Sequence, residues 1–92
     1  MFDASGLSLY QTPFCPYCED VRVVARRLAL DLPLRDIYES PAYFQELVEA
    51  TGRQTVPCLR IEREDGSVDW MHESEDIAEY LEARFGARND PS

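Results

Sequence analysis

Apolar residues recur along the chain with two different spacings, which predicts short strands alternating with helices. Residues 7–11 alternate apolar and polar side chains, as in a half-buried strand, and Thr12-Pro13 ends this pattern. From Pro16, a residue suited to a first helical turn, to Pro33, apolar side chains recur three and four positions apart. They would form the buried stripe of a first helix, made of Cys18, Val21, Val24, Ala25, Leu28 and Ala29.

The middle of the chain predicts a second strand and a second helix. Residues 34–38 have the composition of a short strand. Ser40 is a favoured N-cap residue, Pro41 is a favoured first-turn residue, and Gly52 provides a C-cap. The inner face of this helix would carry Phe44, Leu47, Val48 and Thr51.

The last third of the chain predicts a hairpin followed by a helix. Residues 57–62 and 67–71 lie on either side of Glu64-Asp65-Gly66, which favours an antiparallel pair joined by a tight turn. We expect Ser74 to cap a final helix and Gly86 to stop it. The inner face of that helix would carry Ile77, Leu81 and Phe85.

These elements follow one another in the order β-α-β-α-β-β-α, which defines the fold class. A right-handed crossover makes the first two strands parallel, and the hairpin adds an antiparallel pair. We therefore expect an α/β fold with a four-stranded mixed sheet and helices on both faces. Ninety-two residues are enough for one core and too few for two, so residues 1–92 should form a single domain.

The charge and hydropathy of the chain exclude two classes of partner. Eighteen acidic residues oppose nine basic ones, all arginine, and the net charge of −9 would repel nucleic acid and anionic lipid. No apolar run approaches the roughly 18 residues of a membrane span. Residues 1–6 lack the basic and apolar regions of a signal peptide, so we expect a cytoplasmic location. In that reducing environment, cysteines are more often catalytic or metal-binding than structural.

Cys15-Pro16-Tyr17-Cys18 carries the clearest chemistry, because it places one thiol before a helix and a second one turn inside it. Unpaired amides and partial positive charge at a helix N-terminus stabilise a thiolate, so Cys15 is the expected nucleophile. Cys18 shares the apolar stripe, which suits a less ionised resolving thiol. The same spacing also arises by chance or in half of a zinc site. Zinc needs two more ligands, and Cys58 and His72 form no second pair, so we expect no metal.

At this motif the sequence resembles the glutaredoxin family, and the resemblance covers nearly the whole chain. Cys15-Pro16-Tyr17-Cys18 looks like the dithiol active site of that family, Thr55-Val56-Pro57 like its cis-proline motif, and residues 73–76 like the start of its last helix. The resemblance implies a thioredoxin-like fold and glutathione as co-substrate. It also implies a monomer that reduces glutathione mixed disulfides and protein disulfides, with Cys15 as nucleophile and Cys18 as resolving thiol.

A glutathione site follows from the same resemblance. The Val56 backbone would pair with the cysteine portion of glutathione like an added strand. Ser74 and the first amides of the last helix would hold the γ-glutamyl carboxylate, and Glu73 or Asp76 its ammonium. The implied glutathione contacts are Thr12, Tyr17, Arg53, Thr55, Val56, Pro57, Glu73, Ser74 and Asp76.

Two features depart from the glutaredoxin pattern. Many glutaredoxins have a Gly-Gly pair before the last helix, whereas Glu73-Ser74 is closer to the signature of glutathione transferase N-terminal domains. An ordinary N-cap explains this pair equally well, and a full transferase needs a second, helical domain for which 92 residues leave no room. Thr12 stands where many glutaredoxins have a lysine, which predicts a less stabilised Cys15 thiolate and weaker glutathione binding. Arg53 would supply a carboxylate clamp instead, or be a solvated arginine near a helix end.

Three alternatives share parts of this pattern. A thioredoxin-like electron donor would use the same two thiols with a reductase in place of glutathione. A dimeric iron–sulfur cluster carrier would use two Cys15 thiolates and two glutathiones, although Pro16 stiffens the motif. A redox-inert binding module would hold a partner on the acidic surface. Outside the motif, we interpret Cys58 as a packing residue and His72 as a solvated or hydrogen-bonded strand end.

Overall fold

Strands and helices alternate along the chain in the computed structural model, which describes residues 2–89 and the side chains of residues 4–86. In chain order the elements are β1 (Phe2–Asp3), β2 (Leu7–Gln11), α1 (Pro16–Arg27), β3 (Leu30–Asp31), β4 (Leu34–Asp36), α2 (Pro41–Thr51), β5 (Cys58–Glu62), β6 (Val68–Met71) and α3 (Ser74–Asn89).

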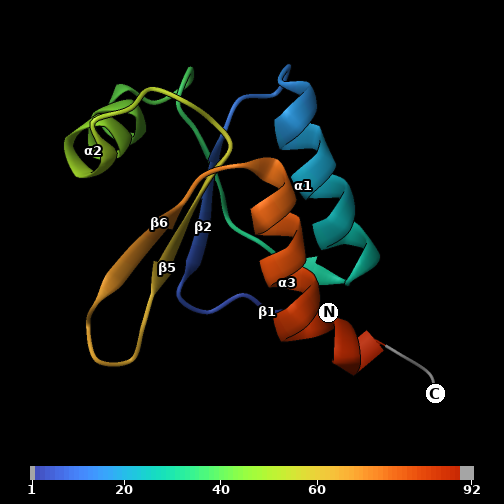
Figure 1. Cartoon of the computed structure of the whole chain (residues 1–92). Helices are drawn as coiled ribbons and strands as arrows, with labels where there is room; N and C mark the ends of the chain where they lie inside the picture. Colours follow the sequence, from blue (N-terminus) through green and yellow to red (C-terminus); the bar gives the residue numbers. More distant parts are fainter. Residues whose placement is uncertain (1, 90–92) are drawn as a thin grey trace.

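A mixed sheet of four strands lies at the centre of the molecule, in the order β4-β2-β5-β6 (Figure 1). β4 is parallel to β2, and β5 is antiparallel to both β2 and β6. This is the sheet that the sequence predicts. Its two parallel strands, β2 and β4, each end close to the start of a helix, so β2 leads directly into the cysteine motif.

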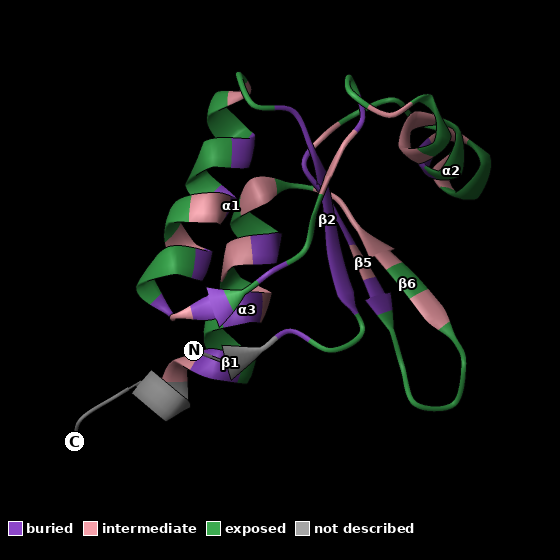
Figure 2. Ribbon diagram, turned by 180° about the vertical axis from the view of Figure 1, so that it is seen from behind, coloured by how far each residue is buried: buried purple, intermediate pink, exposed green. Residues whose placement is uncertain are grey.

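Residues that alternate along β2 and β5 face opposite sides of the sheet and build two cores. Leu9 and Leu59, which are cross-strand partners, lie in the larger core with residues of α1 and α3. Tyr10 and Cys58, the next pair, lie in the smaller core with Leu47 of α2. Helices therefore cover both faces of the sheet, as predicted, and Figure 2 shows the buried residues of β2 and β5 between them.

The first helix ends earlier than its apolar pattern predicts. α1 stops at Arg27, Leu28 is its C-cap, and Ala29 has a left-handed φ of 55°. The chain then turns into β3, which pairs in parallel with β1 to form a second, two-stranded sheet. The sequence analysis missed both short strands, because two residues carry too little pattern to identify a strand and residues 30–31 directly follow the apolar spacing of the helix.

Local signals set most of the remaining boundaries. Ser40 caps α2 through a hydrogen bond from the Tyr43 amide, and Gly52 ends the helix with φ 70°, both as predicted. β4 ends at Asp36, two residues before the predicted end, because the Asp36 carboxylate accepts hydrogen bonds from the Tyr38 and Glu39 amides. This turn removes residues 37 and 38 from the strand.

Three further boundaries differ from the prediction. β5 begins one residue late, at Cys58, and β6 one residue late, at Val68. Gly86 does not stop α3, which continues to Asn89, since glycine costs only about 1 kcal/mol inside a helix when no cap forms. Of the inner face predicted for α2, Leu47 is fully buried and the other three side chains are half-buried. Within residues 2–89, no helix has the length and apolarity needed to cross a bilayer.

Candidate functional site

Cys15 occupies the N-cap position of α1, the place that the sequence predicts for it. Its backbone is extended, with φ −86° and ψ 120°, and its carbonyl accepts the first helical hydrogen bond from the Glu19 amide at 3.0 Å. Pro16 follows at the start of the helix. The Cys15 thiol is half-buried and free, and its side chain makes no capping hydrogen bond. It is therefore within reach of a reagent in solution.

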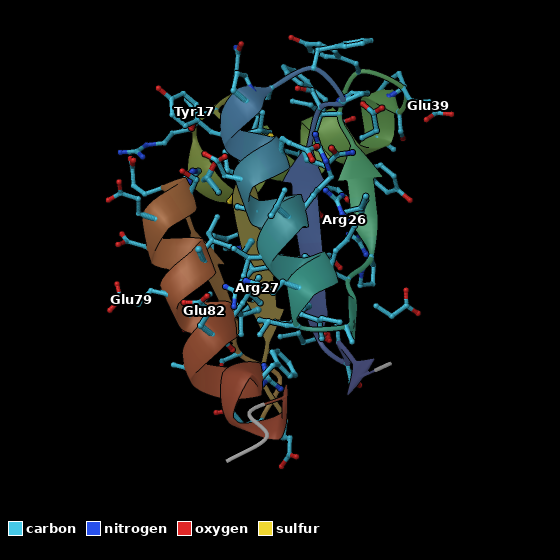
Figure 3. All side chains as sticks on the ribbon, turned by 90° about the vertical axis from the view of Figure 1, so that its right-hand side faces the viewer. Tyr17, Arg26, Arg27, Glu39, Glu79 and Glu82 are labelled. Carbon is cyan, nitrogen blue, oxygen red and sulfur yellow. The ribbon has the colours of Figure 1, made fainter. Side chains whose placement is uncertain are left out.

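Exposed aromatic side chains flank this thiol. Phe14 has 89% of its surface exposed and Tyr17 has 64%. Figure 3 shows Tyr17 at the N-terminal end of α1, near the start of α3. Two exposed aromatic residues therefore lie close in sequence to the predicted nucleophile.

Cys18 lies one turn into α1 and is completely buried. Burial, together with contact with the Cys15 thiol, raises the pKa of Cys18 to about 12, although the Thr12 backbone and the Arg22 charge act in the opposite direction. The prediction that Cys18 is the less exposed of the two thiols is confirmed. Cys15, Cys18 and Cys58 are all free thiols.

Arg22 is a residue of this region that the sequence analysis missed. It lies one turn after Cys18 on α1, and its guanidinium contacts the residues that connect β2 to the helix. The four-residue spacing from Cys18 and the three-residue spacing from Glu19 were signals available in the sequence. They indicate a shared helix face but not the contact with the preceding loop.

Thr12 is buried in this connecting segment, and its carbonyl accepts a hydrogen bond from Arg22 at 3.1 Å. It does not line the pocket described below. Its assignment as a glutathione contact stays a prediction without support from the pocket geometry.

The Val56–Pro57 peptide bond is cis, as the resemblance implied. Within the described part of the chain, the Val56 amide and carbonyl take no part in a backbone hydrogen bond. Gly52 and the Thr51 hydroxyl, which accepts a hydrogen bond from the Arg53 amide at 3.1 Å, form the turn that leads from α2 into this segment. A free backbone edge therefore lies between Arg53 and β5.

The start of α3 differs from the prediction by one residue. Glu73, with a left-handed φ of 72°, provides the carbonyl that accepts the Ile77 amide at 3.0 Å, so Glu73 is the N-cap and Ser74 the first helical residue. The chain must turn sharply between β6 and α3, and Glu73 makes that turn. The amides of residues 74–76 then have no partner within the helix and point to its N-terminal end.

A cavity of about 490 Å³ brings these segments together, a volume typical of small-molecule sites. It gathers eight of the nine predicted glutathione contacts, all except Thr12, and adds His72 and Glu75. Tyr17 is its lining residue from the cysteine motif. The complete lining consists of Tyr17, Arg53, Thr55, Val56, Pro57, His72, Glu73, Ser74, Glu75 and Asp76.

The cavity carries both signs of charge. Arg53 contributes a guanidinium that forms no ion pair with any described residue. Glu73, Glu75 and Asp76 contribute carboxylates at the start of α3. A zwitterionic ligand with separated charges would match this arrangement.

His72 links the cavity to the smaller core. Its Nδ1 lies 3.4 Å from the Thr55 hydroxyl, and its Nε2 lies 3.8 Å from the Cys58 sulfur. Burial lowers the pKa of His72, the nearby Arg53 charge lowers it further, and Glu73 raises it. The interpretation of His72 as a hydrogen-bonded strand end is consistent with these contacts.

Cys58 is fully buried among Tyr10, Ile37 and Leu47. Burial raises the pKa of its thiol to about 12. It therefore packs as an apolar residue, as predicted. Across residues 2–89, no group of three or more histidine, cysteine, aspartate or glutamate side chains is arranged to hold a metal ion.

Comparison with known proteins places this geometry in a family context. A profile of the glutathione S-transferase N-terminal domain matches residues 9–89. Among curated proteins no significant match was found. A Bombyx mori glutathione transferase superposes with a TM-score of 0.69 and 25% identity, over 92% of this chain and 38% of its own. A trimeric Leishmania glutathione transferase superposes with a TM-score of 0.62 and 32% identity, over 94% of this chain and 20% of its own.

A maleylacetoacetate isomerase from Anaeromyxobacter dehalogenans, with bound dicarboxyethyl glutathione and citrate, has a TM-score of 0.65 and 24% identity over 94% of this chain and 38% of its own. The chain thus spans well under half the length of each of these proteins. The likenesses show the thioredoxin-like α/β fold that the sequence predicts. Glu73-Ser74 is the pair that the sequence analysis likened to glutathione transferase N-terminal domains, the family of the matching profile. The resemblance to glutaredoxins is supported at the level of the shared thioredoxin-like fold.

Proposed function

The chain belongs to the family of glutathione S-transferase N-terminal domains, and from this membership we propose that it binds glutathione and catalyses glutathione-dependent thiol–disulfide exchange through Cys15. The observation that carries the proposal is the pair of thiols at the start of α1. Cys15 is free and half-buried at the helix end, and Cys18 is free and fully buried one turn further on. Conjugation chemistry has no need of the second thiol.

The cavity offers a complementary group for each part of glutathione. The unpaired Val56 amide and carbonyl would pair with the cysteine portion as an added strand. The α3 N-terminus with Ser74 would hold the γ-glutamyl carboxylate, because unpaired amides and the helix dipole favour an anion there. Glu73 or Asp76 would hold the ammonium, and Arg53 the glycine carboxylate.

The exchange reaction begins with attack of the Cys15 thiolate on the glutathione sulfur of a mixed disulfide. A bond forms between Cys15 Sγ and that sulfur, the original S–S bond breaks, and the electron pair leaves on the substrate sulfur, which takes a proton from water. A second glutathione thiolate then attacks the bound glutathione sulfur. Oxidised glutathione leaves and the Cys15 thiolate is regenerated, so the net reaction consumes one glutathione per substrate.

Cys18 would contribute a slower, second route. With a pKa of about 12 caused mainly by burial, its thiol is protonated at neutral pH and is a poor competitor of free glutathione. We therefore expect the monothiol route to dominate, with protein and peptide mixed disulfides of glutathione as substrates. Glutathione is the expected co-substrate.

The test is glutathione-coupled reduction of a glutathionylated peptide by wild type, Cys15→Ser and Cys18→Ser. We expect turnover to vanish in Cys15→Ser and to remain within about threefold of wild type in Cys18→Ser. Cys58→Ala is the control for loss of a thiol elsewhere, with its fold checked by circular dichroism. No turnover by wild type, or equal turnover by Cys15→Ser, would overturn the proposal.

A second candidate is transfer of glutathione to an electrophile, which the glutathione transferases among the similar structures favour. An electrophilic aromatic chloride offered with glutathione to the same variants distinguishes the two. Conjugation that persists in Cys15→Ser, without disulfide reduction by wild type, would select the transferase activity.

A further inference from the structure

The last residue of β2, Gln11, and the two residues that follow it towards the cysteine motif are bound by a single side chain from α1. The Arg22 guanidinium donates from NH1 to the Gln11 side-chain oxygen and to the Thr12 carbonyl, the latter at 3.1 Å. From NH2 it donates to the Pro13 carbonyl at 3.3 Å. Two consecutive loop carbonyls thus take the same guanidinium as partner.

The remaining donors of Arg22 bind a carboxylate on its own helix. Its Nε and NH2 donate to Glu19 Oε2 at 3.1 and 2.9 Å. Arginine has five N–H donors, and each of the five contacts above takes one of them. Only 13% of the Arg22 side chain is exposed. Every N–H donor of the guanidinium is therefore hydrogen-bonded, which fixes the side chain. We refer to the contacts of Arg22 with residues 11–13 as the Arg22 bracket.

The segment held by the Arg22 bracket also affects the buried Cys18 thiol. The Thr12 backbone, whose carbonyl accepts from Arg22, also acts on the Cys18 thiol and lowers its pKa. Cys18 in turn contacts the Cys15 thiol. Arg22, which lies one helical turn after Cys18, therefore fixes the segment just before Cys15.

We propose that Arg22 is a positioning residue for disulfide closure: it holds residues 11–13 against α1, keeps the Thr12 backbone on Cys18, and places a positive charge near that thiol. The inference rests on the proposed function, since it concerns how the Cys15 mixed disulfide is resolved.

In the step that Arg22 supports, Cys18 first loses its proton to water or buffer. The Cys18 thiolate then attacks Cys15 Sγ, a Cys15–Cys18 disulfide forms, and the bond from Cys15 to glutathione breaks. The electron pair leaves on the glutathione sulfur, which is protonated in solution. The Cys15 thiol raises the pKa of Cys18, and the Thr12 backbone and the Arg22 charge lower it.

Arg26 provides a matched control on the same helix. It pairs with Glu19 at 2.9 Å, as Arg22 does, but 64% of its side chain is exposed and it makes no hydrogen bond to residues 11–13. It is labelled in Figure 3. Like Arg22→Gln, Arg26→Gln removes one positive charge and one ion pair to Glu19, but it leaves the contacts between Arg22 and residues 11–13 in place.

The experiment starts from protein carrying glutathione on Cys15, prepared by reaction with an activated glutathione disulfide. Release of glutathione and formation of the Cys15–Cys18 disulfide are followed by acid quenching and mass spectrometry between pH 6 and pH 10. We expect Arg22→Gln to slow closure by about tenfold or more throughout this pH range, which lies below the Cys18 pKa of about 12, because the thiolate fraction falls tenfold for each unit by which that pKa rises. Arg26→Gln should stay within about twofold of wild type.

Arg22→Lys separates charge from geometry. Lysine keeps the positive charge but lacks the planar fork, so Arg22→Lys should close more slowly than wild type and faster than Arg22→Gln at the same pH. If Arg22→Gln does not fold, the closure rate of Arg22→Lys relative to wild type provides the test. A merely structural role would lower the melting temperature of both variants and leave the closure rate of each folded variant within about twofold of wild type, with no partial rescue by lysine.

Two outcomes separate this inference from the proposed function. Closure equal in wild type, Arg22→Gln and Arg26→Gln would overturn the role of Arg22 even where Cys15-dependent turnover is intact. Absence of that turnover would overturn the proposed function, while closure from the prepared mixed disulfide still measures the Arg22 effect. In a Cys18→Ser background, Arg22→Gln should change turnover by less than about threefold, and a larger loss would place Arg22 at Cys15 instead.

Discussion

The Tyr10 hydroxyl joins the central strand to α2 by donating a hydrogen bond to Glu46 Oε1 at 2.9 Å. It also accepts a hydrogen bond from Arg35 NH1 at 2.7 Å, and the Arg35 guanidinium lies over the rings of both Tyr10 and Tyr43. Tyr10 is completely buried, so these contacts satisfy its only polar group. Because α2 leads into Arg53 and Val56, the position of the cavity wall depends on this attachment.

Tyr10→Phe should therefore destabilise the protein without changing its fold. The lost hydroxyl leaves Arg35 and Glu46 without this partner, and a hydrogen bond to a half-exposed charged group is worth about 1 kcal/mol. Urea denaturation should show a lower midpoint with an unchanged slope. Tyr38→Phe is the control, since Tyr38 has 76% of its surface exposed, and equal midpoints for the two variants would contradict the prediction.

Gly6→Ala should be more destabilising than Gly52→Ala. Both glycines have a left-handed φ, +83° and +70°, which costs a residue with a Cβ about 1–2 kcal/mol. At Gly6 a Cβ would also lie 2.5 Å from the Glu62 carbonyl oxygen, whereas at Gly52 it meets nothing within 4 Å. Thermal unfolding of the two variants measures the difference, and a Gly52→Ala loss equal to that of Gly6→Ala would show that the Gly6 backbone can move aside.

His72 should make stability fall as the pH drops below about 6.5. Its pKa is lowered in the folded protein, first by burial and then by Arg53, so the unfolded chain binds the proton more tightly in this range and acid favours unfolding. The stability is present above the unfolded value and is lost as pH falls through the folded value. His72 is the only histidine in the chain, so His72→Gln should flatten the dependence between pH 7.5 and pH 5.5.

Chemical denaturation at several pH values measures this effect. Glu19 and Asp65 have lowered pKa values, so they titrate at lower pH than His72. Their contribution should be the same in wild type and in His72→Gln. An identical pH dependence in wild type and His72→Gln would show that protonated His72 is accommodated without cost.

Arg53→Gln should weaken glutathione binding by about tenfold, because a charge-assisted contact to a carboxylate would be lost. The loss should shrink as salt is added, since Arg53 is exposed. Isothermal titration with glutathione measures it. Arg84→Gln, a surface arginine on α3 whose NH1 binds the Tyr80 hydroxyl, is the control and should bind glutathione like wild type.

The position of the nucleophile follows from local sequence. An alternating strand, the Thr12-Pro13 break, and a proline one residue after Cys15 are enough to put that thiol at a helix end, because each acts over a few residues. The Ser40 and Gly52 caps of α2 follow for the same reason. The alternation of β2 and β5 likewise identifies which side of the sheet each residue faces.

What only the tertiary structure decided depends on contacts between distant segments. The left-handed turn at Ala29 brings Leu30 into its pairing with Phe2 of β1, at the start of the described chain. Glu73, not Ser74, caps α3 because β6 and α3 must meet at a sharp angle. Packing between segments also decides two further features: the contacts of Arg22 with the loop before Cys15, and the presence of His72 and Glu75 in the cavity lining. No local pattern in the sequence encodes these positions.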